Sequence, residues 1–258
     1  MLMSSLATRS VRIVGRVAFV LAVLLSPMGV SRAEESPFDT AQTEAIERIL
    51  RAYLLEHPEI IGEAVGVLQA REEAAKQATM EANLGKLRAD VERDPQTPVL
   101  GNPDGDVTIT EFHDYRCGYC KVAYKPLMKI IKEDGHVRLV LKDLPLLGPD
   151  SYVAAKAALA AHAQGKYAAF LNEGMTHRGV FNAEAIEAIA KRIGLDMARF
   201  KKEMDSAAID QQLEKNRFLA QALEIAGTPV FIIGNRMIPG AAGEQHFKEL
   251  IALARGQR

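Results

Sequence analysis

Residues 111–120 read EFHDYRCGYC and contain both cysteines of this 258-residue chain. Alternating side chains over 107–112 predict a strand, and apolar residues at helical spacing over 117–132 predict a helix. The two cysteines, separated by two residues, therefore lie where a strand passes into a helix. This order of strand, cysteine pair and helix predicts an α/β domain.

The cysteine pair fits redox chemistry better than metal binding or a purely structural role. A zinc site needs about four ligands, and Cys117 and Cys120 supply half of them. None of the six histidines shows the short spacing that would complete such a site, and the nine methionines are scattered along the chain. A disulfide across so short a loop also adds little stability. We therefore expect no metal and no cofactor.

The two cysteines are expected to differ in reactivity. If the helix begins at Cys117, the free backbone N–H groups of its first turn and its dipole stabilise a thiolate there, and Arg116 and Lys121 add positive charge. Cys117 is therefore the expected nucleophile. Cys120 lies one turn deeper, where burial keeps it protonated until it attacks a mixed disulfide formed at Cys117.

Glu111 is the candidate proton acceptor for Cys120, because it lies on the strand expected to run beneath the helix. A partly exposed edge position is an equally good interpretation of this residue. Lys142 ends a second predicted strand that covers 137–141, and it could pair with Glu111. A lysine beside Asp143 is more often just solvated.

The rest of the domain follows the same alternation of strands and helices. An alanine-rich stretch over about 148–226 predicts several helices. Residues 230–233 predict a further strand, which a two-residue turn joins to a short partner at 237–238. An amphipathic helix over 243–255 closes the chain.

Residues 34–95 predict helices outside this domain, with a break at His57-Pro58. Beyond Leu68 the apolar stripe is too narrow to bury against a globular core, which favours an exposed stalk that assembles the chain into a dimer or trimer. The alternative is that the segment folds back on its own domain. Prolines and glycines over 96–105 predict a linker. The expected contacts of the stalk are Ile46, Leu50, Tyr53, Ile61, Val65 and Leu68.

Residues 1–33 have the three parts of a secretory signal peptide, with arginines, an uncharged apolar run over 17–25 and small residues before an expected cleavage after Ala33. The apolar run is far shorter than the ~20 residues that span a bilayer, so a membrane anchor is the poorer interpretation. We expect export to the periplasm, where disulfides form and persist. The net charge of -1 makes nucleic acid an unlikely partner.

Residues 106–258 resemble the DsbA family of thioredoxin-fold disulfide oxidoreductases. The resemblance rests on 111–120, on 142–146 (KDLPL), on the helical insertion and on 227–230 (GTPV). It implies an α/β thioredoxin fold with an inserted helical domain, preceded by the helical stalk. It also implies that Pro229 is cis and faces the cysteines, whereas an ordinary trans proline at a strand start is the alternative.

The resemblance also implies how a substrate would bind. A proline at position 229 offers no N–H, and the backbone of Thr228 is left free to pair with an extended substrate segment. Gly118 and Tyr119, between the cysteines, are the other expected substrate contacts. These two residues and Thr228 depart from the Pro-His and Val of the best-known DsbA pattern, and they resemble the disulfide isomerases of the DsbC type.

Residues 53–61 (YLLEHPEII) resemble the leader of ScsC-like proteins, which are DsbA relatives linked to copper tolerance in which an N-terminal extension can assemble an oligomer. The first candidate activity is therefore disulfide isomerisation on exported proteins with cysteines, supported by a membrane redox partner of the DsbD or DsbB kind. The alternatives are a monomeric DsbA-like oxidase, a reductant serving one client, and a copper-binding chaperone that uses the same two thiolates.

Overall fold

The computed structural model describes residues 37–256, which divide into two units, one up to Gly66 and one from Val67. The expected signal peptide over 1–33 and its cleavage site lie outside the described residues. Over residues 37–256, no helix is both long and apolar enough to cross a membrane.

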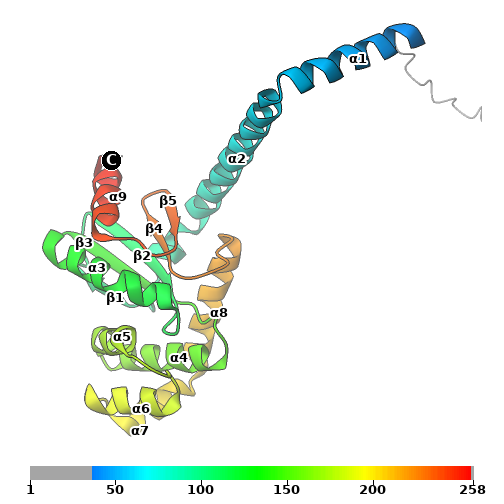
Figure 1. Ribbon diagram of the computed structural model, residues 1–258. Helices are drawn as coiled ribbons and strands as arrows, with labels where there is room; N and C mark the ends of the chain where they lie inside the picture. The colour runs from blue at the N-terminus through cyan, green and yellow to red at the C-terminus, as the bar shows by residue number, and fades with distance from the viewer. Residues whose placement is uncertain (1–36, 257–258) are drawn as a thin grey trace, which may run out of the picture. The chain divides into compact units, whose positions relative to one another are not determined.

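The first unit contains α1 (Thr40–Glu56) and the first turns of α2 (Glu59–Glu92) (Figure 1). Asp39 and Gln42 cap α1 with a reciprocal pair of hydrogen bonds. The helices separate at the predicted His57-Pro58 break, and no residue of α1 is buried. The large apolar side chains exposed in this unit are Phe38, Ile46, Ile49, Leu50, Tyr53, Leu54, Leu55, Ile61 and Val65. This unit therefore presents an apolar surface that residues 37–256 leave exposed.

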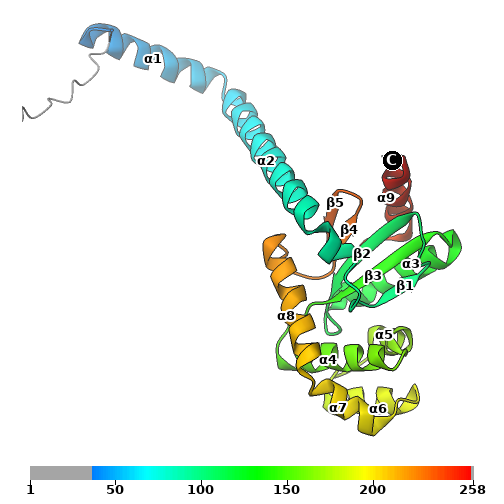
Figure 2. The ribbon, with the colours of Figure 1, turned by 180° about the vertical axis from the view of Figure 1, so that it is seen from behind.

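The second unit is built on a five-stranded sheet in the order β1-β3-β2-β4-β5 (Figure 2). The central pair, β2 (Val107–His113) and β3 (Val137–Asp143), is parallel. The strands β1 (Val99–Gly101), β4 (Val230–Ile233) and β5 (Arg236–Pro239) join antiparallel. Nearly every residue of β2, β3 and β4 is buried, as expected when helices cover both faces of a sheet.

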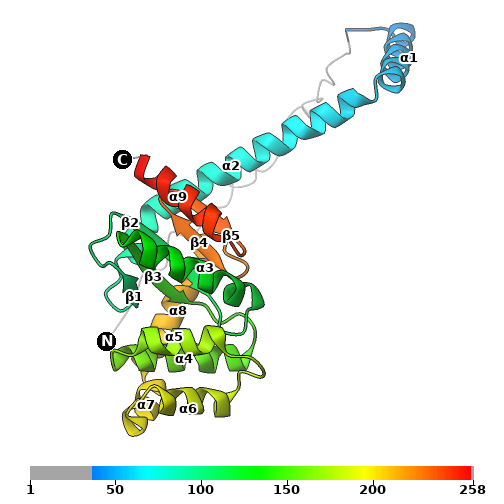
Figure 3. The same ribbon diagram turned by 60° about the vertical axis from the view of Figure 1, so that its left-hand side comes forward.

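Helices cover the two faces of this sheet in separate groups (Figure 3). Helices α3 (Gly118–Asp134) and α9 (Glu244–Gly256) pack on one face, and α8 (Ala207–Ala222) and the end of α2 pack on the other. The chain between β3 and β4 forms the predicted helical insertion. Besides α8, it contains α4 (Pro149–Ala163), α5 (Tyr167–Thr176), α6 (Ala183–Arg192) and α7 (Met197–Met204).

Successive side chains of a strand point to opposite faces of the sheet, so neighbouring residues belong to different hydrophobic cores. Ile109 of β2 packs in the core with α3 and α9, whereas Phe112 packs in the core with α2 and α8. By the same alternation, Lys142 and Asp143 reach opposite faces of the sheet. This separation determines which side chains can meet the cysteine pair.

The interval 96–105, expected to be a linker, contains β1, which is hydrogen-bonded to β3. The end of α2 is also part of the second unit, because Leu84 and Val91 are buried against Phe112. The stripe on α2 was expected to be too narrow for burial. Ala75, Ala78 and Ala82 of that stripe are exposed, whereas the sheet and α8 together cover Leu84 and Val91, so the folded unit begins upstream of Asp106.

Candidate active site

The cysteine pair lies at the start of α3. Cys117 is the N-cap residue of α3, and the first helical residue is Gly118. Cys117 is 7% exposed and Cys120 is fully buried. Burial raises the pKa of Cys120, and the charge of Glu111 acts in the same direction. The geometry thus separates a slightly accessible cysteine at the helix start from a fully buried one beneath it, whose pKa is raised.

The cis-proline loop faces the cysteine pair. The Thr228–Pro229 peptide bond is cis, which confirms what the family resemblance implies. The thiol of Cys117 donates to the backbone oxygen of Thr228 at 3.1 Å. Pro229 is buried and Thr228 is partly exposed. A backbone oxygen in contact with the accessible sulfur is thus within reach of a segment bound at that sulfur.

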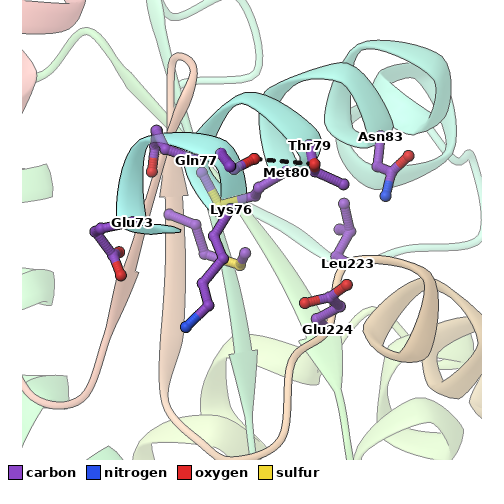
Figure 4. A pocket seen from close by; sticks show the side chains of 10 residues that line it. Glu73, Lys76, Gln77, Thr79, Met80, Asn83, Leu223 and Glu224 are labelled. Carbon is purple, nitrogen blue, oxygen red and sulfur yellow. Dashed lines mark hydrogen bonds between the residues drawn. The ribbon is translucent and has the colours of Figure 1, made fainter. Parts of the chain in front are cut away.

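Two cavities lie next to this loop, between α2 and the segment that joins α8 to β4. The first has a volume of about 440 Å³ and is lined by Thr228 and Pro229. The second, of about 370 Å³, is the one drawn in Figure 4. Both cavities are lined by Glu73, Gln77, Met80, Glu224 and Met237. Together they form a mixed apolar and acidic recess beside the cis-proline loop, which the sequence did not predict because it requires α2 to pack on the catalytic unit.

Glu111 is buried on the central strand of the sheet, so the edge interpretation is wrong. It projects from the face that packs against α3. Burial raises the pKa of Glu111 to about 7; the charge of His113 opposes this rise, and that of Asp143 adds to it. A carboxyl group of this kind exchanges its proton near neutral pH.

Sequence reasoning missed two residues that lie beside Glu111. Asp143 is the register partner of His113, and His113 Nε2 lies 3.4 Å from Asp143 Oδ1. The hydroxyl of Tyr167 donates to the other Asp143 oxygen at 3.0 Å. Burial alone would lower the pKa of His113, but Asp143, Glu111 and Asp114 together raise it. The two-residue spacing of Glu111 and His113 on one strand is the signal that could have indicated this group.

Lys142 does not pair with Glu111, because it lies on the opposite face of the sheet. Its ammonium group donates to the backbone oxygen of Asp90 and to Thr97 Oγ1, each at 2.8 Å, and it lies 3.7 Å from Asp94 Oδ2. Burial lowers the pKa of Lys142 to about 8. The possible pairing with Glu111 is therefore wrong, and so is the alternative of a solvated lysine, because Lys142 is fully buried. The sequence does not reveal which core a β3 residue reaches.

The charged ends of Arg116 and Lys121 are bound away from the cysteine pair. Arg116 donates to the backbone oxygen of Leu147 at 2.8 Å and lies 3.7 Å from Asp150. Lys121 donates to the backbone oxygen of His177 at 2.9 Å. Of the positive groups expected beside Cys117, the first turn of α3 adjoins it, whereas the charged ends of these two side chains have other partners.

The residues between the cysteines are open to solvent. Tyr119 is 69% exposed, and a side chain at Gly118 would meet no atom within 4 Å. Over residues 37–256, no cluster of three or more His, Cys, Asp or Glu side chains could hold a metal ion. The soft ligands that this site offers are the two cysteine sulfurs.

The fold, the cis-proline loop and the cysteine pair define the class of thioredoxin-fold thiol-disulfide oxidoreductases. Residues 93–252 match the family model described as Thioredoxin, and the chain belongs to this family. Residues 42–75 match the model described as Copper resistance protein ScsC N-terminal domain.

Three solved structures place the chain with DsbA-like and ScsC proteins. A thioredoxin-like oxidoreductase from Silicibacter pomeroyi DSS-3 is 38% identical, with 66% of this chain and 98% of that chain covered and a TM-score of 0.64. The thiol-disulfide exchange protein alpha-DsbA2 from Wolbachia pipientis is 30% identical, with 69% and 97% covered and a TM-score of 0.65. Proteus mirabilis ScsC in a transitional conformation is 25% identical, with 86% and 99% covered and a TM-score of 0.63.

Other relatives are much longer proteins. The Na(+)/H(+) antiporter NhaA 1 of Salinispora arenicola is 28% identical over 145 residues, which are 55% of this chain and 22% of the antiporter. The chain therefore spans about a quarter or less of the antiporters that it matches.

Proposed function

We propose that the protein is a periplasmic thiol-disulfide oxidoreductase that reshuffles disulfides in exported proteins through Cys117 and Cys120. The observation that carries this proposal is the contact between Cys117 Sγ and the Thr228 oxygen in front of cis-Pro229. It joins an accessible sulfur to a backbone edge that can pair with an extended client segment. The expected signal peptide supports the location.

The proposed reaction begins when the Cys117 thiolate attacks a client disulfide. A bond forms between Cys117 Sγ and one client sulfur, and the other client sulfur leaves as a thiolate. In isomerisation, a second client thiolate then attacks the mixed disulfide and regenerates the Cys117 thiolate. Alternatively, Cys120 transfers its proton to Glu111 and attacks Cys117 Sγ, which releases a reduced client and leaves the pair oxidised.

We assign the client contacts to the surface around this sulfur. The Thr228 backbone, beside Pro229, would pair with the client main chain, while Gly118 and Tyr119 would flank it. The recess lined by Glu73 and Met80 would receive client side chains. Helix α2 offers a matched pair of positions for testing the recess. Glu72 and Glu73 are both exposed, but only Glu73 lines the recess, so a substitution at Glu73 should weaken client binding and the same substitution at Glu72 should not.

The N-terminal segment is the proposed oligomerisation element, and a dimer or trimer is the expected state. Of the proposed segment 34–95, residues 38–68 carry the exposed large apolar side chains, whereas the end of α2 packs in the second unit. The match of residues 42–75 to the ScsC N-terminal model supports the proposal. Several catalytic units on one stalk would raise the local thiol concentration around a client.

Light scattering and a scrambled-ribonuclease assay test this proposal. Deleting residues 34–66 should give a monomer that keeps thiol chemistry and loses isomerase activity. Leu50→Glu should have the same effect, whereas Arg51→Glu, an exposed charge change next to it, should keep the oligomer. A monomeric full-length protein at micromolar concentration would contradict the proposal, as would a truncated protein that isomerises equally well.

The direction of transfer is tested by the redox state of the cysteine pair in cell extracts. A mostly reduced pair supports an isomerase or reductant kept reduced by a membrane partner of the DsbD kind. A mostly oxidised pair supports instead a DsbA-like oxidase recharged by a partner of the DsbB kind. Exported proteins with cysteines are the proposed clients in either case.

A copper-binding chaperone is the second candidate function, because the ScsC N-terminal model carries the description of a copper resistance protein. Reduced Cys117 and Cys120 would supply the ligands. Titration of the reduced protein with Cu(I) against a competing chelator tests this candidate. Tight stoichiometric binding that disappears in Cys117→Ser would support it, and thiol exchange without such binding would exclude it.

A further inference from the structure

The polar side chains beside Glu111, those of His113, Asp143 and Tyr167, are buried and have no role in the thiol chemistry above. His113 follows Glu111 by two residues on β2, so both side chains project from the same face of the sheet. Asp143 lies opposite His113 on β3. Glu111 is 3% exposed, His113 0% and Asp143 1%. We call Glu111, His113, Asp143 and Tyr167 the His113 cluster.

The charge balance of this cluster depends on His113. Ionised Glu111 and ionised Asp143 repel each other because both are buried, and a cation beside them offsets one of the two charges. Burial lowers the pKa of His162, which is the other histidine near Asp143. His113 is therefore the group that supplies positive charge. The titratable groups that face His113 are Glu111, Asp114 and Tyr115 from β2 and the turn that follows, and Asp143 from β3. His162 from α4 and Tyr167 from α5 lie near Asp143.

We propose that His113, held as an imidazolium by Asp143, is a positioning residue that keeps Glu111 able to accept the Cys120 proton at neutral pH. This inference rests on the proposed function of Glu111 as the proton acceptor. The proton moves from Cys120 Sγ to the Glu111 carboxylate, and the Cys120 thiolate then attacks Cys117 Sγ in the mixed disulfide.

The step exchanges the mixed disulfide for the Cys117–Cys120 disulfide. The Cys117–Cys120 bond forms, the bond from Cys117 to the client breaks, and the client sulfur leaves with the electron pair. The cysteine pair is oxidised, and the client cysteine is reduced. Glu111 then returns its proton to the client thiolate or to water. Without the imidazolium, Glu111 would hold its proton to higher pH and would fail to accept another.

Stopped-flow reaction with excess Ellman's reagent isolates this step. Attack by Cys117 releases one thionitrobenzoate, and attack by Cys120 on the resulting mixed disulfide releases the second. In His113→Gln, the pH midpoint of the second release should move up by about one unit, which is the effect expected from removing one nearby opposite charge. Below both midpoints, the second release should slow about tenfold. The first release should not change, and the exposed His136→Gln is the matched control.

The possible outcomes separate this inference from the proposed function. A folded His113→Gln with the wild-type midpoint overturns the inference. If Glu111→Gln abolishes the pH dependence of the second release while His113→Gln keeps the wild-type midpoint, the role of His113 is wrong and the role of Glu111 stands. If Glu111→Gln keeps the wild-type profile, the proposed role of Glu111 fails as well. Should His113→Gln not fold, nitrogen NMR of the wild-type protein decides, because a neutral His113 ring at pH 7 would overturn the inference and a doubly protonated ring would support it.

Discussion

Two buried clusters of charged side chains lie on opposite faces of one sheet, and the adjacent residues Lys142 and Asp143 belong to different ones. In the Lys142 cluster, formed by Asp94, Thr97, Lys142 and Gln212, the polar groups hydrogen-bond to one another or to backbone. In the His113 cluster, the two ring nitrogens of His113 have no hydrogen-bond partner among the described residues. Of the two Asp143 oxygens, one accepts a hydrogen bond, which Tyr167 donates.

The difference between the clusters indicates a difference in task. A buried polar group without a hydrogen bond costs roughly 1–3 kcal/mol, so a cluster kept for stability satisfies its members. The Lys142 cluster meets this condition and joins the end of α2 to the sheet. The His113 cluster is joined by the 3.4 Å contact of His113 with Asp143 and by the hydrogen bond from Tyr167, and it lies on the face that carries Cys120. We therefore assign stability to the first cluster and proton transfer to the second.

The largest expected effect comes from removing the sulfur chemistry that the His113 cluster serves. Cys117→Ser should abolish disulfide exchange, because the attacking thiolate is lost. Cys120→Ser should trap mixed disulfides with clients, because the first attack survives and the release step does not. Non-reducing gels followed by peptide mapping measure both results. Equal alkylation of Cys117 and Cys120 in the wild-type protein at mildly acidic pH would contradict the assignment of roles.

The next largest effect should come from breaking the Lys142 cluster. Lys142→Met removes the cation beside buried Asp94 and should lower the free energy of unfolding by roughly 3–5 kcal/mol. Urea titration measures the loss. Thiol exchange per folded molecule should not change, since this cluster lies on the other face of the sheet. The control is Lys129→Met, which removes an exposed ion pair with Glu244 and should leave stability unaltered.

Glu111→Gln should stabilise the protein at alkaline pH. The pKa of Glu111 is about 7 in the folded protein against 4.5 for the free group. Between these values only the folded state holds the proton, so wild-type stability falls as pH rises from 4.5 to 7 and stays lowered above 7. Glutamine does not ionise, and the variant should gain up to about 3 kcal/mol at pH 8 relative to pH 4. Denaturation at both pH values tests the sign, and an equal difference from wild type at both would contradict it.

A substitution outside both clusters should have the smallest effect. Tyr119 is exposed beside the reactive sulfur, so Tyr119→Ser should change the free energy of unfolding by less than about 0.5 kcal/mol. The kcat/KM for a client should fall only a few-fold, because one contact with the client is removed. A loss as large as that in Cys117→Ser would show that Tyr119 does more than contact the client.

The local motifs of this protein could be predicted from its sequence, whereas contacts between distant segments could not. Strand, cysteine pair and helix are contiguous, and the threonine and proline at 228–229 precede an apolar strand. The His113 cluster requires the register of β2 against β3, and that register determines that His113 meets Asp143. Burial of Leu84 requires a sheet face and α8 that the α2 sequence does not reveal.

The face of the sheet occupied by Glu111 should control the Cys120 proton, and the opposite face should not. The measurement to make is the rate of the second thionitrobenzoate release at pH 7, taken side by side in Glu111→Gln and Lys142→Met. We predict a release slowed by about 10²-fold or more in Glu111→Gln, as is typical for loss of a general base, and an unchanged rate in folded Lys142→Met. Equal slowing in both variants, or in neither, would contradict the claim.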